Sequence, residues 1–225
     1  AALVRIRNLN QNGFDIHIQE WDYLDGDHST ETVSYMAMEK GTYTLDNGAK
    51  FEAGPFEAAS SFSAVAMKQS YDVTPVILTQ VATISDDTAV TGRVRNVSQH
   101  SFEYKLQEQE TTSKAHQPET VGYIAWEPGI GNLGDLHYEV GTTGKRVKHQ
   151  WYTSAFQSSL PDTPLYIAEM QTTTGGDTAS LRTLDMTKAS VRIKVEEEQS
   201  KDSEIRHTKE NVGFLAIGAA PPSGQ

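Results

Sequence analysis

An internal repeat constrains the fold of this 225-residue chain more than any other feature of its sequence. Three segments that begin at Arg5, Arg93 and Arg182 align with one another. The first two align without a gap and the third carries two extra residues, so the period is about 88 to 91 residues. Repetition at this length predicts that the chain folds as several copies of one structural unit.

A second block of sequence precedes only two of these segments. It runs from AKFEAG to ILTQVAT in one case and from LHYEVG to AEMQTT in the other, with Pro75 aligned to Pro164. The repeat therefore predicts a late half-unit at 1–42, complete repeats at 43–131 and 132–218, and a tail or linker at 219–225. Because three strands cannot close a sandwich, we expect an upstream half or a neighbouring chain to complete the half-unit, in the second case by strand addition.

Within each copy the spacing of apolar residues is that of strands. FDIHIQE, FEYKLQE and VRIKVEE alternate apolar and polar residues, as does ETVGYIAWE, and turn residues such as LDNG and TTGG separate them. No stretch of ten or more residues has helical spacing. The pattern predicts an all-β chain of tandem antiparallel β-sandwiches with about six strands each. The expected core residues of one unit are Ile77, Val81, Val94, Phe102, Tyr104, Leu106, Val121 and Tyr123.

Composition excludes several classes of protein. The formal charge of −11 argues against a nucleic-acid partner, because phosphate binding needs clustered basic residues. No apolar run approaches the ~20 residues that span a bilayer, and the absence of cysteine excludes disulfides and thiolate sites. The sequence has neither a nucleophile elbow nor HExxH, and its one GxGxxG precedes an expected strand rather than a helix. We therefore expect a protein that is not an enzyme.

The order of three motifs resembles a known family. TPVILTQVATI, RVRNVSQHSFEYKLQEQE and ETVGYIAW are similar to blocks of the H-type lectins, first known from snail agglutinins, and of bacterial proteins that carry such domains in tandem. The resemblance implies a six-stranded antiparallel β-sandwich that binds galactose-type or N-acetylgalactosamine-type sugars, often as a trimer. It also implies an extracellular, secreted or cell-surface, bacterial protein.

The resemblance assigns candidate sugar-binding positions. In the snail proteins an arginine, and a tryptophan followed by a polar residue at the end of the next strand, hold the sugar. The matching positions here are Arg5, Trp21 and Asp22 in the first copy, Arg93, Gln109 and Glu110 in the second, and Arg182, Glu198 and Gln199 in the third. The aromatic ring recurs only at Trp21, where sugar stacking or an interface role and packing within the hairpin are both open.

A histidine followed three residues later by a glutamate recurs in every copy. The pairs are His28/Glu31, His116/Glu119 and His207/Glu210, and Glu20, Glu108 and Glu197 end the preceding strand of each copy. Residues i and i+3 point to opposite sides of a strand, which disfavours a shared site on the strand itself. A glutamate–histidine bridge that holds the hairpin is the preferred interpretation, with a metal site and catalysis as alternatives.

Acidic residues gather at two expected hairpin tips. Asp22, Asp25 and Asp27 stand close together beside a glycine, and residues 196–204 form a second acidic stretch at the same place in the third copy. Closely spaced oxygen ligands suit Ca²⁺, so calcium is the possible cofactor, and a solvated acidic turn is the alternative.

Two hypotheses about function follow. The first is a non-enzymatic carbohydrate-binding or adhesive module whose partner is a glycan or polysaccharide. The second is a structural repeat, or a fibre subunit completed by strand addition between chains, which predicts self-association or further repeats of a longer chain. An accessory domain of a polysaccharide-degrading enzyme is a third possibility. Glycan binding without polymer formation separates the first hypothesis from the second.

Overall fold

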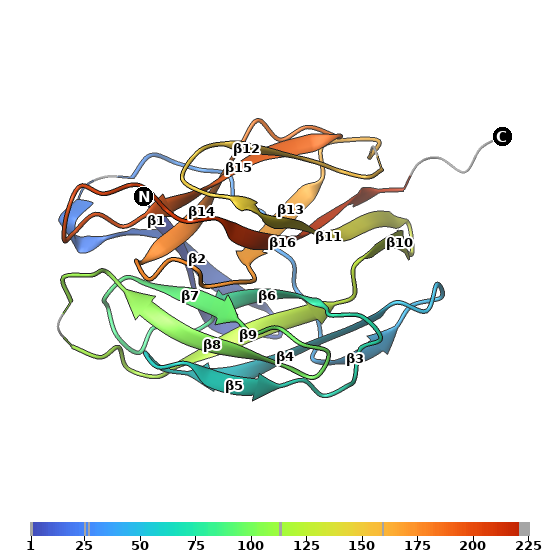
Figure 1. Ribbon diagram of the computed structural model, residues 1–225. Helices are drawn as coiled ribbons and strands as arrows, with labels where there is room; N and C mark the ends of the chain where they lie inside the picture. The colour runs from blue at the N-terminus through green and yellow to red at the C-terminus, as the bar shows by residue number, and fades with distance from the viewer. Residues whose placement is uncertain (1, 25, 27, 113, 159, 221–225) are drawn as a thin grey trace.

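The all-β prediction is confirmed. The computed structural model describes residues 2–24, 26, 28–112, 114–158 and 160–220. In this described part the chain forms sixteen strands, β1 to β16, and one short 3-10 turn, η1, at Asp22–Leu24 (Figure 1). Its described residues contain no helix with the length and apolar character needed to cross a membrane.

The second copy of the repeat is an antiparallel sandwich, referred to below as copy 2. One sheet has the order β3 (Gly41–Thr44), β4 (Lys50–Ala58), β9 (Glu119–Trp126) and β6 (Val76–Val81). The other has the order β5 (Ser63–Ala66), β8 (Ser101–Glu108) and β7 (Val90–Arg95). The eight expected core residues fill the space between these sheets, and none is more than 5% exposed.

Copy 3 repeats this topology strand for strand. Its larger sheet has the order β10 (Gly129–Leu133), β11 (Leu136–Val147), β16 (Glu210–Ala219) and β13 (Leu165–Met170). Its smaller sheet has the order β12 (Tyr152–Ala155), β15 (Ser190–Glu197) and β14 (Ala179–Leu184). Each sandwich thus has seven strands rather than about six, because a short edge strand, β3 or β10, extends the larger sheet.

The first copy, copy 1, is a hairpin followed by an extended segment. β1 (Ala2–Asn10) pairs with β2 (Gly13–Glu20) in a two-stranded sheet. Residues 31–38 align with β9 and β16, yet they carry no strand assignment. β9 pairs with β4 and β6, and β16 pairs with β11 and β13, whereas no strand pairs with 31–38 in the part of the chain that the structure describes. Backbone groups need such partners to form a strand, so a strand-like sequence alone does not make one.

The three copies surround one apolar centre. The larger sheets of copies 2 and 3 meet through their outward faces, and two methionines from copy 1 pack against the same cluster. Equivalent positions of the repeat supply this centre: Met36, Ile124 and Leu215 form one set, and Met38, Trp126 and Ile217 form the other. Figure 1 shows the two sandwiches one above the other, with β1 beside β6. The central cluster therefore unites all three copies.

Candidate functional site

The contacts between copies, called seams below, contain most of the side chains predicted to be functional. Seam 1 joins copies 1 and 2, seam 2 joins copies 2 and 3, and seam 3 joins copies 3 and 1. Each seam centres on the arginine that recurs at one repeat position, in β1, β7 or β14. This arginine reaches out of its own copy and into the next.

In seam 1, Arg5 enters the loop between β6 and β7 of copy 2. Its guanidinium donates to the carbonyl oxygens of Thr83 (3.2 Å) and Thr88 (3.3 Å) and to the carboxylate of Glu119 (3.2 Å). Both charged side chains are completely buried. Burial lowers the pKa of Arg5, and the Glu119 carboxylate opposes that shift. A buried charge is tolerated here because a counter-ion and carbonyl groups replace its water.

Seam 2 repeats this arrangement between copies 2 and 3. Arg93 donates to the carbonyl oxygens of Asp177 (2.7 Å) and Gly175 (3.2 Å), and its Nη2 lies 3.6 Å from a carboxylate oxygen of Glu210. Both charged side chains are again completely buried. Burial lowers the pKa of Arg93, while Glu210 acts in the opposite direction.

Seam 3 brings the third arginine to the first copy. Arg182 lies 3.6 Å from Glu31 of copy 1 and 3.6 Å from Glu196 of its own copy. Its side chain remains 35% exposed and that of Glu31 is 41% exposed. Copy 1 meets copy 2, copy 2 meets copy 3 and copy 3 meets copy 1 through the same pair of residue types. The three seams therefore form a closed cycle.

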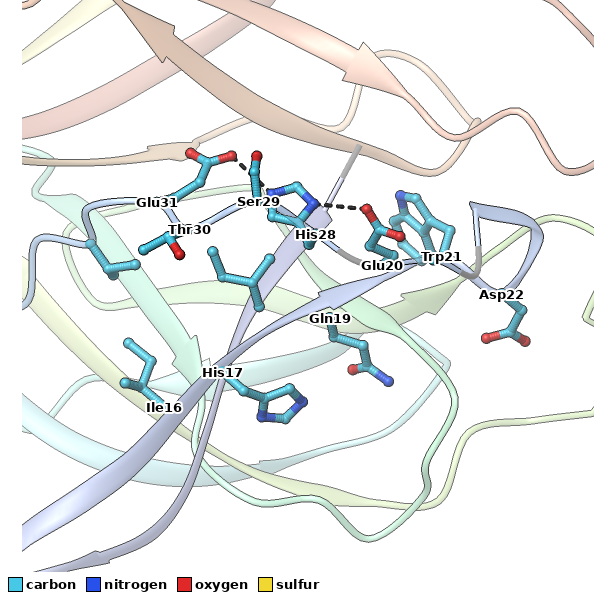
Figure 2. Close-up of a pocket in the computed structure, with 13 residues that line it drawn as sticks. Ile16, His17, Gln19, Glu20, Trp21, Asp22, His28, Ser29, Thr30 and Glu31 are labelled. Atoms are coloured by element: carbon cyan, nitrogen blue, oxygen red, sulfur yellow. Dashed lines mark hydrogen bonds and ion pairs between the residues drawn. The ribbon is translucent and has the colours of Figure 1, made fainter.

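The recurring histidine is hydrogen-bonded to the glutamate of each arginine–glutamate pair. In copy 2 the His116 ring lies between Glu108 (2.6 Å from Nδ1) and Glu119 (3.0 Å from Nε2). His28 lies in the same way between Glu20 (2.7 Å) and Glu31 (2.9 Å), as Figure 2 shows, and His207 lies between Glu197 (2.6 Å) and Glu210 (3.1 Å). All three copies thus contain a histidine hydrogen-bonded between two glutamates.

The position of the histidine explains how residues i and i+3 meet. His116 lies in the irregular segment before β9, and Glu119 is the first residue of the strand, so strand alternation does not separate them. Burial acts to raise the pKa of Glu119, but hydrogen bonds from Thr83, His116 and Ser85 outweigh it and lower the pKa. This carboxylate therefore joins a hairpin, a loop and a neighbouring copy.

Residues at the positions assigned to sugar binding contact residues of the neighbouring copy, in or beside these seams. Trp21 is 1% exposed and packs with Leu3 and Ala89, so its ring has no open face toward solvent. The Asp22 amide donates to Gln109 (3.1 Å), the Glu110 amide donates to Glu198 (2.8 Å), and the Gln199 amide donates to the hydroxyl of Tyr23 (3.0 Å). These contacts link the three hairpin tips in the same cyclic order as the arginines.

Two groups of side chains are candidates for holding a metal ion, one expected from the sequence and one found in the structure. Of the proposed calcium ligands, Asp25 and Asp27 lie outside the described residues, and Asp22 is exposed at the start of η1. Among the described residues, oxygen and nitrogen atoms of Asp86, Glu108 and His116 lie within 4.8 Å of one another. Copy 3 has Gly175 at the position of Asp86, where a Cβ would come within 2.5 Å of the His207 ring. Copy 3 thus lacks the aspartate of this cluster, whereas the histidine bridge recurs in all three copies.

Sequence reasoning missed a group of polar residues in seam 2. The Gln171 side chain accepts from the Ile77 amide (2.8 Å) and donates to the Ile77 carbonyl (2.7 Å), which satisfies the edge of β6. Beside it, Glu169 accepts from the Thr79 hydroxyl (2.8 Å), and burial raises its pKa to about 7. Copy 2 has Ala82 and Gln80 at these positions, so neither residue is part of the repeated pattern that would have drawn attention to it.

Tandem antiparallel β-sandwiches joined by buried arginine–glutamate–histidine seams define a multi-copy β-repeat module. In an alignment of 222 positions that covers 96% of the chain, the chain is 35% identical to a segment of halomucin from the archaeon Haloquadratum walsbyi. The chain spans 2% of the length of that protein. No family model and no solved structure matches the chain. This relative comes from an archaeon, so it does not support the bacterial source that the lectin resemblance implied.

Proposed function

We propose that the chain is a non-enzymatic structural module of an extracellular mucin-like polypeptide, in which three copies of one β-unit are held together as a single body. One observation carries the proposal: the recurring arginine of each copy pairs with the recurring glutamate of the next copy, and the histidine of that copy holds the glutamate in place. Arg5 and Arg93 are completely buried and paired, and Trp21 is covered. The name of the relative, halomucin, is the basis for the extracellular mucin-like context.

The buried pairs suit this role because they are costly to break. Removing one member of a buried ion pair leaves an uncompensated charge, which typically destabilises a protein by about 3–5 kcal/mol. Seams 1 and 2 also share the central apolar cluster, so separating copies would expose apolar surface as well. A module of this kind acts as a stiff segment within a long chain.

The test is the cooperativity of unfolding. Wild-type protein should unfold in one transition by calorimetry, and Arg93→Met should split or broaden that transition because copy 3 separates from copies 1 and 2. Arg95→Met is the matched control, since Arg95 lies two residues away in β7 and its ion pair with Glu103 is partly exposed. Identical transitions in the two variants would contradict the proposal.

A specific observation also favours glycan binding at a different place. Trp151 is 38% exposed, and the guanidinium of Arg192 (5.4 Å) and the ammonium of Lys194 (5.2 Å) lie over its ring. At the same repeat position in copy 2, Arg95 (3.7 Å) and Lys105 (5.2 Å) lie over Phe62. An aromatic ring beside cations suits a sugar that carries a carboxylate.

This second candidate is tested on an immobilised uronic-acid polysaccharide at low salt. Trp151→Ala should lose retention, whereas Leu136→Ala, which truncates another exposed apolar side chain of copy 3, should keep it. Equal retention of the two variants, or no retention of the wild type, would rule this site out.

A further inference from the structure

Copy 1 exposes residues that the other copies bury. Ile16 is 41% exposed, whereas its counterparts Tyr104 and Ile193 are 1% and 0% exposed. Tyr35 is 59% exposed, whereas Tyr123 is 5% exposed. The repeat therefore places core side chains on a surface that faces no partner among the described residues.

The exposed face is shaped like half of a sandwich interior. Figure 2 shows the hollow between β2 and the segment that starts at His28, and its volume is 820 Å³. Every residue that lines it belongs to copy 1. The rings of Phe14 and Tyr35 meet edge to face at 5.2 Å across the same face, and the equivalent rings of Phe102 and Tyr123 lie 5.6 Å apart in a tilted arrangement. The aromatic contact of a sandwich core is therefore already formed on the open face of copy 1.

The two complete copies show what covers such a face. In copy 2 the residues equivalent to this surface pack against Ala58, Val65, Ile77 and Val81, which come from β4, β5 and β6. β4 and β6 also flank β9 on both sides, which is the pairing that residues 31–38 lack. One half-unit would therefore cover the apolar residues and supply the missing ladder partners together.

Seam 3 gives an independent indication of the same occupant. Arg5 and Arg93 each donate to carbonyl oxygens of the loop that follows β6 or β13, and Thr83 and Thr172 from those loops donate to the acceptor glutamates. Arg182 and Glu31 have the ion pair without such a loop, and both remain exposed. Seam 3 thus lacks the carbonyl and threonine hydroxyl groups that the loop after β6 or β13 supplies in seams 1 and 2. This loop is the last part of a half-unit.

We propose that the open face of copy 1 binds a half-unit built like residues 41–88, carried ahead of copy 1 in the same longer polypeptide. The register supports a direct connection, because Ala2 pairs with Glu20 as Val90 pairs with Glu108. A second copy of the chain fits less well, since its own half-units already complete copies 2 and 3. Docking completes a third sandwich, makes 31–38 a central strand and buries Arg182.

The test is the full chain with a duplicate of residues 41–88 joined directly before Ala1. Hydrogen exchange should slow at least about 100-fold at the amides of 33–37, because these become hydrogen-bonded in a central strand. Binding of an apolar dye should fall in parallel. The matched control carries Ile77→Asp in the duplicate alone, which places a charge in the new core, and should restore fast exchange.

Three outcomes would overturn the proposal. Fast exchange at 33–37 with the intact duplicate would show that the half-unit does not dock. Equal protection with the intact and the I77D duplicate would show that docking does not use this core. Slow exchange in the wild-type chain, together with a dimer or larger species by light scattering, would show that a second copy covers the face. Unfolding of Arg93→Met tests the structural role separately.

Discussion

Seams 1 and 3 use the same arginine and glutamate from the same repeat positions, yet their environments differ completely. Arg5 and Glu119 are fully buried, and loop carbonyl groups surround the guanidinium. Arg182 and Glu31 are 35% and 41% exposed and lie 3.6 Å apart. Identical residue types therefore form a structural ion pair in one place and a weak surface pair in the other. Burial and additional hydrogen bonds account for the difference. Four measurements on the buried seams 1 and 2 and on the exposed seam 3 test this explanation.

The largest effect is expected from Glu119→Ala. This change leaves the buried Arg5 without its counter-ion and removes a hydrogen-bond partner of His116, so the free energy of unfolding should fall by about 3–5 kcal/mol. Urea denaturation followed by circular dichroism measures the loss. The control is Glu31→Ala in the exposed seam. A similar loss in both variants would mean that burial does not distinguish the seams.

Glu169→Gln should stabilise seam 2 above neutral pH. The pKa of Glu169 is raised from 4.5 to about 7 in the folded state, so the wild-type protein loses stability as pH rises from about 4.5 to about 7. A neutral glutamine, which copy 2 has as Gln80, removes that dependence. We expect a gain of about 1–3 kcal/mol at pH 8 and little change at pH 4. An equal effect at both pH values would contradict this explanation.

Arg182→Ala should cost less than about 1 kcal/mol, because an exposed ion pair is worth little in water. The loss should shrink further in 1 M salt, where charges are screened over about 3 Å. Thermal unfolding at low and high salt measures both effects. A loss comparable to that of Glu119→Ala, insensitive to salt, would show that seam 3 is already closed.

The smallest effect concerns the pH dependence of seam 3. Hydrogen bonds to Glu20 and Glu31 raise the pKa of His28 above 6.5, so its contribution to stability is complete below pH 6.5 and disappears as pH rises through the raised pKa. Titration by nuclear magnetic resonance should show this pKa, and Glu20→Gln should move it back toward 6.5. An unchanged pKa in that variant would exclude the bridge as the cause.

The sequence predicted the sheets better than the seams. Alternation in FEYKLQE places Phe102, Tyr104 and Leu106 on one face, and all three are buried as expected. The partner of Arg5 is Glu119, and no local pattern reveals a contact across that separation. Residues 31–38 have a strand-like sequence but lack neighbours for a ladder, a condition that periodicity does not report. Glu169 and Gln171 lie within the repeat, but copy 2 has Gln80 and Ala82 at the aligned positions, so the repeat gave no signal for them.

The cyclic order of the seams restricts how a longer chain of such units can grow or shrink. Each copy donates an arginine to the next copy and receives one from the previous copy, so three copies satisfy every donor and every acceptor. Insertion or deletion of one copy would leave an arginine without its glutamate and a gap at the central apolar cluster. Such a polypeptide should therefore change its length during evolution by whole triplets.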